Sequence, residues 1–358
     1  MRIPLLKPNP PKVKDWEKYI QLSYDTSIFS NGGPCSNLLE ERLKNYLSLK
    51  EKPILMCNAT VALTVVLESF GLKDCEILIP SFTFAATAHS VLNACCLPVL
   101  VDIDDDLCLC LEDAEKKMTC HTKAIVVVQP LGYVCNYKKY EEFAKKNDLI
   151  LIFDSAAALG ANYSDGTKIG NGGDCEIFSL HITKTFGIGE GALVTGKDIA
   201  FLEICRKKIN FGFENNISKM SGTNAKCSEF HAAIGLAVLE VIDEKIKNKQ
   251  RIADYYHSKL KETVKTLNRN TAHQVFPIIL KDKNQRDTLI KNLNKNNIQT
   301  KIYYIPIHRQ DYFKFLDKSE LVKTDYYSDR ILCIPFFEQI TKKEQDTVIL
   351  LIKNYFLK

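Results

Sequence analysis

Short runs of β-forming residues alternate with helical stretches between residues 53 and 195, and this alternation constrains the fold more than any other feature of the sequence. Such alternation is typical of a largely parallel sheet with helices on both faces. The runs are nearly continuous in Ile, Leu and Val, as expected of strands buried on both faces. Strands are predicted at 54–57, 76–79, 98–101, 124–128, 149–153, 176–179 and 192–195, and helices at 60–70, 85–94 and 137–146.

The pattern changes in the C-terminal part of the chain. From about 227 to 264, Ala, Leu and Ile recur with Glu and Lys at helical spacing, which predicts a long helix leading into a smaller domain. A chain of 358 residues is long enough for two cores, which we place in domains 1–245 and 246–358. The smaller domain is expected to be α+β, with strands at 274–280 and 299–304 and helices at 286–293 and near 342–356.

Charge and hydropathy exclude several classes of protein. The net charge of +5 comes from 48 basic and 43 acidic residues that are scattered, without the block of like charge that marks a nucleic-acid-binding arm. Prolines and lysines interrupt the N-terminal stretch, so it lacks the apolar core of a signal peptide, and no later run is long enough to span a bilayer. We therefore expect a cytoplasmic protein that binds neither nucleic acid nor a membrane.

The 13 cysteines lie mostly in apolar stretches, and no CxxC pair recurs at the spacing of a zinc site. Reduced cysteines that pack as small hydrophobic side chains are the simplest interpretation. We therefore expect no metal site.

A single lysine, Lys184, lies between the predicted strand 176–179 and a turn that contains Gly187, Gly189 and Gly191. Glycines let the backbone turn tightly and approach a bound group closely. A partly desolvated lysine can lose its proton and attack an aldehyde carbon. The motif alone leaves a solvated loop lysine open as the alternative.

Three other strand ends carry candidate residues. Asp154 ends the strand 149–153, where ligands of open α/β sheets gather, and beside pyridoxal phosphate an acid would keep the pyridine nitrogen protonated. Thr60 begins a helix whose free N–H groups could hold a phosphate, and Phe84 follows a strand where it could stack on a ring. Helix capping by Asp154 or Thr60 and core packing of Phe84 are the alternatives.

These signals occur in order at successive strand ends. Taken together, they make the sequence resemble the DegT/DnrJ-type nucleotide-sugar aminotransferases. This family belongs to the fold type I pyridoxal-phosphate enzymes, and the resemblance covers nearly the whole chain. It implies an α/β fold like that of aspartate aminotransferase. The large domain would have a mostly parallel seven-stranded sheet flanked by helices, and the smaller C-terminal domain would be α+β. The stretches that carry the resemblance are 31–34, 39–40, 58–63, 80–84, 98–104, 178–191, 232–235 and 334–335.

The resemblance implies a role for individual residues. Lys184 matches the lysine that forms the Schiff base with pyridoxal phosphate and then moves a proton between the cofactor and the sugar carbon. Asp154 matches the partner of the pyridine nitrogen, and Phe84 matches the stacking aromatic. The phosphate contacts correspond to Ala59, Thr60 and Ser179.

Asn224 matches an asparagine that reaches the phosphate of the neighbouring subunit, which implies a homodimer with shared active sites. The candidates for substrate contact are Asn31, Gly32, His181, Glu190, His308 and Arg309. His181 is favoured as a packing or hydrogen-bonding residue rather than a catalytic one, because Lys184 already fills the role of general base.

The implied reaction transfers an amino group from an amino acid, by family habit L-glutamate, to a keto group of a nucleotide-linked deoxysugar. The cofactor would cycle between pyridoxal and pyridoxamine phosphate. The stretch 31–34 favours amination at C4 over C3. The product would be an amino sugar for a polysaccharide or glycan such as lipopolysaccharide O-antigen, and the sequence does not specify the nucleotide.

The sequence departs from the family pattern near the expected ring. Ala157 and Leu159 replace a glutamine and a histidine, Gln129 replaces a histidine, and Ala59 replaces a glycine. These changes leave the lysine chemistry intact but bear on the identity of the sugar. Two alternatives stay open: a sugar dehydratase of the same fold, in which a histidine stands at the position of Lys184, and a non-catalytic regulator that kept the cofactor pocket.

Overall fold

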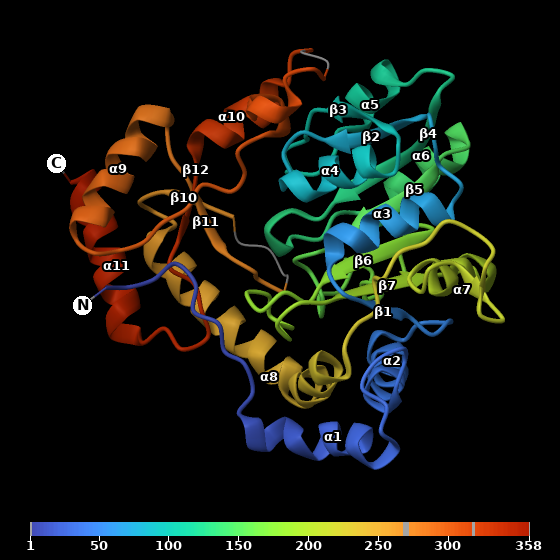
Figure 1. Cartoon of the computed structure of the whole chain (residues 1–358). Helices are drawn as coiled ribbons and strands as arrows, with labels where there is room; N and C mark the ends of the chain where they lie inside the picture. The colour runs from blue at the N-terminus through green and yellow to red at the C-terminus, as the bar shows by residue number, and fades with distance from the viewer. Residues whose placement is uncertain (1, 268–271, 317–318, 358) are drawn as a thin grey trace.

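The larger domain is built on a seven-stranded sheet with the strand order β1-β7-β6-β5-β4-β2-β3 (Figure 1). The structure is a computed structural model that describes residues 2–267, 272–316 and 319–357. Every strand predicted between 53 and 195 overlaps an observed strand. The strands are β1 (Ile54–Met56), β2 (Glu76–Pro80), β3 (Leu97–Val101), β4 (Thr122–Val128), β5 (Ile150–Asp154), β6 (Cys175–Ser179) and β7 (Ala192–Gly196).

Strand β7 is antiparallel to both β6 and β1, while the other neighbouring strands pair in parallel. The connection 180–191 between β6 and β7 contains no helix, so the chain reverses directly, whereas parallel strands need a longer crossover. Because two reversals restore the original direction, β1 ends at the same edge of the sheet as the parallel strands. The mostly parallel sheet that the sequence implies is confirmed.

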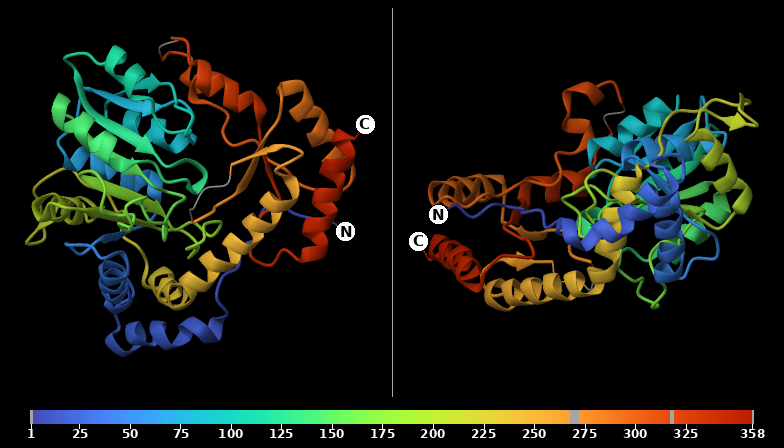
Figure 2. Two further views of the ribbon diagram at one scale, coloured as in Figure 1. Left: turned by 180° about the vertical axis from the view of Figure 1, so that it is seen from behind. Right: turned by 60° about the horizontal axis from the view of Figure 1, so that its bottom comes forward.

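Both faces of the sheet are buried, which explains why its strands lack polar alternation. Ile77 and Ile79 of β2 pack into one apolar cluster, together with the helices α3, α4 and α7, and Leu78 between them packs into another, with α5 and α6. Figure 2 shows these helices on the two sides of the sheet. Their bounds are α3 (Ala59–Ser69), α4 (Ala85–Asn93), α5 (Leu111–Lys117), α6 (Tyr137–Asn147) and α7 (Ile199–Lys208).

The smaller domain has an antiparallel sheet in the order β10-β11-β12, covered by helices (Figure 1). Its elements are β10 (Lys265–Thr266), β11 (Phe276–Ile279), β12 (Ile331–Ile334), α9 (Lys283–Lys295), α10 (Val322–Arg330) and α11 (Lys342–Phe356), with short 3-10 turns at Ile307–Arg309 and Asp311–Phe313. A further short turn, Pro130–Gly132, and the hairpin β8 (Phe213–Glu214) with β9 (Ile217–Ser218) belong to the larger domain.

The prediction of a strand at 299–304 is wrong. This stretch makes one isolated bridge to the sheet, between Lys301 and Cys333. Ile302, Tyr303 and Tyr304 instead pack onto the apolar cluster that lies between the two domains. The place beside β11 is taken by β12, whose four residues are all buried.

Helix α8 (Glu229–Leu260), predicted as the helical region 227–264, passes from the larger domain to the smaller one. Its first half packs against α1 (Val13–Thr26) and α2 (Pro34–Leu47), and its second half contributes to the core of the smaller domain. The predicted domain boundary after residue 245 falls inside this helix and stays a prediction.

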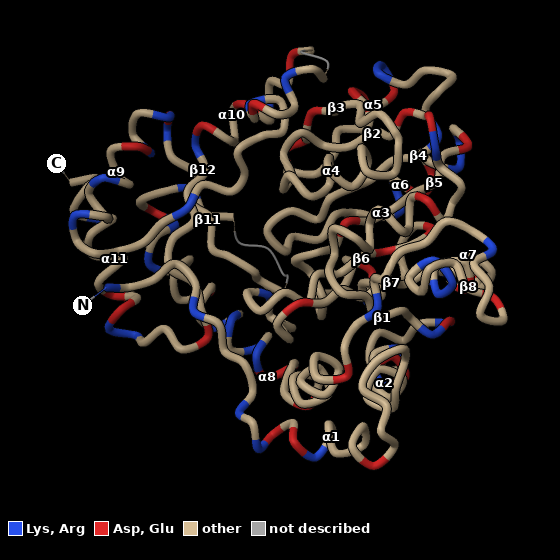
Figure 3. Tube along the Cα trace, viewed as in Figure 1, with Lys and Arg blue, Asp and Glu red and all other residues tan. Residues whose placement is uncertain are grey.

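Basic and acidic residues are intermixed along the trace in Figure 3. Within the part of the chain that the structure describes, no helix is both long enough and apolar enough to cross a bilayer. All 13 cysteines are free thiols, and most are buried.

The first residue of α8, Glu229, is fully buried and accepts hydrogen bonds at the start of α2. Its carboxylate receives the N–H groups of Cys35 and Ser36 at 2.6 and 3.1 Å, the Ser36 hydroxyl, and the Ser23 hydroxyl at 3.2 Å. A carboxylate at a helix N-terminus satisfies free N–H groups and interacts favourably with the helix dipole. Glu229 thus fixes the loop that carries Asn31 and Gly32 against α8.

We expect Glu229→Gln to lower the free energy of unfolding by about 3 kcal/mol, because an amide nitrogen would face buried donors. Urea denaturation followed by circular dichroism measures this change. Glu244→Gln, at an exposed position of the same helix, is the matched control and should change stability by less than about 0.5 kcal/mol. Equal effects of the two substitutions would contradict the role given to Glu229.

Candidate active site

The candidate residues that the sequence places after β1, β2, β5 and β6 lie at one edge of the sheet, because these strands end there. Asp154 is the last residue of β5, Ser179 the last of β6, and Phe84 follows β2 at the start of α4. Helix α3 begins at Ala59, directly after β1. The sheet topology therefore gathers residues that are far apart in the sequence.

Asp154 is held by hydrogen bonds to both carboxylate oxygens. The Thr87 hydroxyl donates to Oδ2 at 2.9 Å, and the Ala156 N–H donates to Oδ1 at 3.2 Å. Thr83 lies 2.8 Å from Thr87, and since the Thr87 proton is used on Asp154, the Thr83 hydroxyl is the donor to Thr87. Burial raises the pKa of Asp154, while these hydrogen bonds and Lys184 act in the opposite direction.

Lys184 lies in a loop that is held together by hydrogen bonds within the loop backbone. The Lys184 N–H donates to the His181 carbonyl at 2.8 Å, and the Ile182 N–H donates to the Gly189 carbonyl at 2.8 Å. Gly187 is required here, because a Cβ atom would lie 2.6 Å from the Ile182 carbonyl oxygen.

The amine of Lys184 is surrounded densely enough by protein that desolvation lowers its pKa, although part of the side chain is exposed. The negative charge of Asp154 opposes this shift. The two groups are therefore close enough to interact electrostatically. A lysine with a lowered pKa can act both as a nucleophile and as a general base.

The start of α3 offers unpaired N–H groups. The Asn58 side chain caps the helix by accepting the Val61 N–H at 2.9 Å. Among the described residues, no hydrogen bond uses the N–H groups of Ala59 and Thr60. The N-terminus of a helix with free N–H groups is a favourable place for a phosphate. Ser179 accepts the His181 N–H at 3.3 Å, so its hydroxyl proton is free to donate.

Phe84 exposes 63% of its area, which is unusual for a phenylalanine and leaves its ring available to a ligand. It immediately precedes α4, the helix that carries Thr87. These features fit pyridoxal phosphate: a desolvated amine for the aldehyde, a buried carboxylate for the ring nitrogen, an exposed aromatic for the ring and free N–H groups for the phosphate. The individual roles stay predictions.

The other predicted residues lie around this edge with partners of their own. His181 Nδ1 is hydrogen-bonded to the Thr183 hydroxyl, with the two atoms 2.8 Å apart, and its Nε2 lies 3.6 Å from the Glu190 carboxylate on the same loop. Asn31 and Gly32 are exposed in the loop between α1 and α2. Asn224 is exposed and forms a backbone bridge with Asn210, and its role toward a neighbouring subunit stays a prediction.

His308 connects the two domains through hydrogen bonds, whereas Arg309 forms ion pairs within the smaller domain. His308 Nδ1 lies 2.8 Å from the Ser81 hydroxyl and Nε2 lies 3.0 Å from Asp325. Arg309 contacts Asp325 and pairs with Asp329 at 2.6 Å. In this arrangement two carboxylates neutralise the Arg309 charge.

Sequence reasoning missed Thr87 and Lys249. Thr87 lies one helical turn after Thr83, and this spacing next to a strand end could have identified it. Lys249 lies in the middle of α8 and gives no signal of its own, since lysines are common in exposed helices. The structure buries it beside the Lys184 loop, with its amine donating to the Thr185 hydroxyl at 2.9 Å.

The sequence profile of the DegT/DnrJ/EryC1/StrS aminotransferase family matches residues 12–353. The dTDP-4-amino-4,6-dideoxy-D-glucose transaminase of Shigella dysenteriae is 28% identical over 361 residues, covering 97% of each chain. The GDP-perosamine synthase of Caulobacter vibrioides is 30% identical over 346 residues, covering 92% of each chain.

Solved structures show the same fold. The structure of DesI in the presence of its TDP-sugar product superimposes with a TM-score of 0.92 at 29% identity, covering 99% of this chain and 92% of that one. A DegT DnrJ EryC1 StrS aminotransferase from Brucella abortus gives a TM-score of 0.89 at 26% identity, covering 96% of each chain.

The raised pKa of Asp154 has a consequence for stability. Because the folded-state pKa lies above the unfolded one, the ionised carboxylate opposes folding, and stability falls as pH rises from the unfolded to the folded pKa. We expect cofactor-free Asp154→Asn to be more stable than cofactor-free wild type at neutral pH, with the difference shrinking as the pH falls through that interval.

Urea unfolding of both proteins across the acid to neutral range measures the effect. Asp148→Asn, at an exposed position after α6, is the control and should show no such pH-dependent gain. A variant that is less stable than wild type at neutral pH would show that Asp154 is favourably paired in the cofactor-free protein.

Proposed function

The chain belongs to the DegT/DnrJ/EryC1/StrS aminotransferase family, and from this premise we propose that it moves an amino group from L-glutamate to C4 of a nucleotide-linked keto-deoxysugar. It is an aminotransferase that depends on pyridoxal phosphate. The observation that carries the proposal is the desolvated Lys184 amine within electrostatic reach of the buried Asp154 carboxylate.

Pyridoxal phosphate, when bound, supplies an electron sink that lets a carbon next to the transferred nitrogen lose its proton. Lys184 Nζ would take this proton from the α-carbon of the donor and, in the second half of the reaction, deliver a proton to the sugar carbon that receives the amine. Asp154 would hold a proton on the ring nitrogen, and Thr87 keeps its carboxylate in place. Phe84 would cover the ring, and Ala59, Thr60 and Ser179 would bind the phosphate.

The relatives support a nucleotide-linked sugar as the amino acceptor. One is a transaminase of a dTDP-linked 4-amino sugar, another is a GDP-perosamine synthase, and DesI was solved with a TDP-sugar product. The stretch 31–34 carries the preference for C4, and Asn31, Gly32, His181, Glu190, His308 and Arg309 are the proposed contacts with the sugar nucleotide. The amino sugar would enter a surface polysaccharide or glycan.

A homodimer with shared sites follows from the proposed role of Asn224. Exposed apolar side chains lie before and after Asn224 in the sequence, and contact with a second subunit would remove them from water. These are Phe211, Phe213, Ile217 and Phe230, each at least 40% exposed. A second copy of the chain would bury them and bring Asn224 to the partner's phosphate site.

Lys184→Ala tests the function directly. Wild-type holoenzyme mixed with L-glutamate should convert to the pyridoxamine form, seen in the absorption spectrum, and borohydride should fix pyridoxal phosphate on Lys184 in peptide maps. The variant should lose both properties, and turnover should fall by about 10²-fold or more. Lys197→Ala is the control, because Lys197 follows β7 at the opposite edge of the sheet. An unchanged spectrum in wild type would favour a regulator or a dehydratase.

A panel of nucleotide-linked sugars resolves the acceptor. We expect 4-keto-6-deoxy sugars carried on dTDP, UDP or GDP to be aminated with kcat/KM at least about 10-fold above the 3-keto isomers, because the position of the carbonyl decides whether it reaches Lys184. Coupled detection of 2-oxoglutarate measures each rate. A preference for 3-keto sugars would overturn the C4 assignment and leave the aminotransferase activity intact.

A further inference from the structure

Lys249 is a buried cation next to the Lys184 loop that the proposed chemistry leaves unused. It lies in α8 with only 4% of its area exposed. Its amine donates to the Thr185 hydroxyl at 2.9 Å and lies 5.8 Å from the centre of the Phe336 ring. A lysine amine has three donors, and only one of them is used by a described residue.

The amine of Lys249 has no carboxylate within ion-pair distance among the described residues. The pKa of Lys249 is lowered to about 8, mainly by burial; the charge of Glu338 opposes this shift, and the charges of Lys245 and Lys184 contribute to it. Burying a cation without a counter-ion is costly. The charge would therefore be stabilised by an anion that enters from outside the chain.

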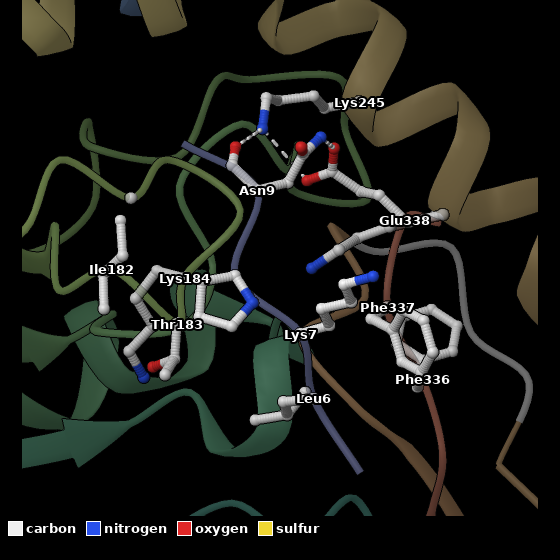
Figure 4. Close-up of a pocket in the computed structure, with 13 residues that line it drawn as sticks. Leu6, Lys7, Asn9, Ile182, Thr183, Lys184, Lys245, Phe336, Phe337 and Glu338 are labelled. Atoms are coloured by element: carbon white, nitrogen blue, oxygen red, sulfur yellow. Dashed lines mark hydrogen bonds and ion pairs between the residues drawn. The ribbon is translucent and has the colours of Figure 1, made fainter. Parts of the chain in front are cut away.

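A small cavity adjoins Lys249. Its walls come from the N-terminal stretch, the Lys184 loop, α8 and the segment after β12 (Figure 4). The residues that line it include four lysines, namely Lys7, Lys184, Lys245 and Lys249. Glu338 is the sole acid among the lining residues that the structure describes.

Glu338 does not neutralise this group of lysines. Its carboxylate already pairs with Lys245 at 3.1 Å and accepts a hydrogen bond from the Asn9 side chain at 2.7 Å. Figure 4 shows Lys245, Asn9 and Glu338 joined at one side of the cavity, with Lys7 and the Phe336 and Phe337 rings at another. The cavity therefore carries a net positive charge that faces the space beside Lys184.

We propose that Lys249 is the binding residue for a carboxylate group of the amino-acid donor. This inference rests on the proposed transamination, which requires a donor with at least one carboxylate close to Lys184. The cavity holds about 20 Å³, the scale of one bound water, which suits a small anionic group such as the tip of a carboxylate. A carboxylate would use the free donors of Lys249 in charge-assisted hydrogen bonds.

The first test compares Lys249→Met with Thr185→Val. Lys249→Met keeps the volume and removes the charge, so the KM for L-glutamate should rise about 10-fold or more, with the KM for the nucleotide sugar unchanged. Thr185→Val removes the hydrogen bond to Lys249 and keeps the charge, so its effect on the KM for glutamate should stay within about 3-fold. Lys247→Met, at an exposed position of the same helix, is the control.

Two results would overturn the proposal. One is an unchanged KM for glutamate in a Lys249→Met protein whose circular dichroism and thermal unfolding match wild type. The other is a Thr185→Val protein that reproduces the full effect of Lys249→Met, because Lys249 would then only position the loop. Alanine as a second donor locates the contact: loss with both donors indicates the α-carboxylate, and loss with glutamate alone indicates the side-chain carboxylate.

A binding measurement separates this inference from the proposed function. Calorimetric titration of the holoenzyme with glutarate, which has carboxylates but no amine, should show binding that Lys249→Met weakens about 10-fold or more. Glutarate binding that is equal in the two proteins would overturn the role of Lys249. Failure of the wild-type protein to transaminate any amino acid would instead overturn the proposed function, and the glutarate titration would still decide the carboxylate site.

Discussion

The desolvated amine of Lys184 and the buried carboxylate of Asp154 are the interaction around which the larger domain is organised. Each group is shifted toward its neutral form by burial, and each shifts the other back through its charge. Such a pair is costly for folding and is maintained only by a rigid surrounding. The buried sheet, the hydrogen bonds from Thr87 and Ala156, and the closed loop around Gly187 supply this rigidity.

Helix α8 connects the parts of the molecule that the sheet does not reach. At its first residue, Glu229 fixes the start of α2 and the adjoining loop. Three turns from its end, Lys249 donates to Thr185 and so contacts the residue next to Lys184. The same helix continues into the core of the smaller domain. The helix thus links the core of the smaller domain to the Lys184 loop and to the cavity beside it.

The strands of the two domains differ in how clearly the amino-acid sequence predicts them, for a physical reason. In the larger domain, strands buried on both faces are continuous apolar runs between helices, so the local pattern of apolar residues in the sequence predicts their positions. In the smaller domain, β12 is a run of only four apolar residues after a helix, and it was missed. The stretch 299–304 has the same apolar character, but its aromatic side chains pack between domains and leave a single bridge to the sheet.

The sequence by itself determined the α/β class, the strand order along the chain, and the family to which Lys184, Asp154 and Phe84 point, because these depend on local patterns and on residues in a characteristic order. Only the tertiary structure decided which groups share an environment. Three hydrogen bonds show this: Thr87 to Asp154, Cys35 to Glu229, and Lys249 to Thr185. They join residues that are 67, 194 and 64 positions apart in the sequence, respectively. Burial of a charge is set by the whole packed surrounding, and no local pattern encodes it.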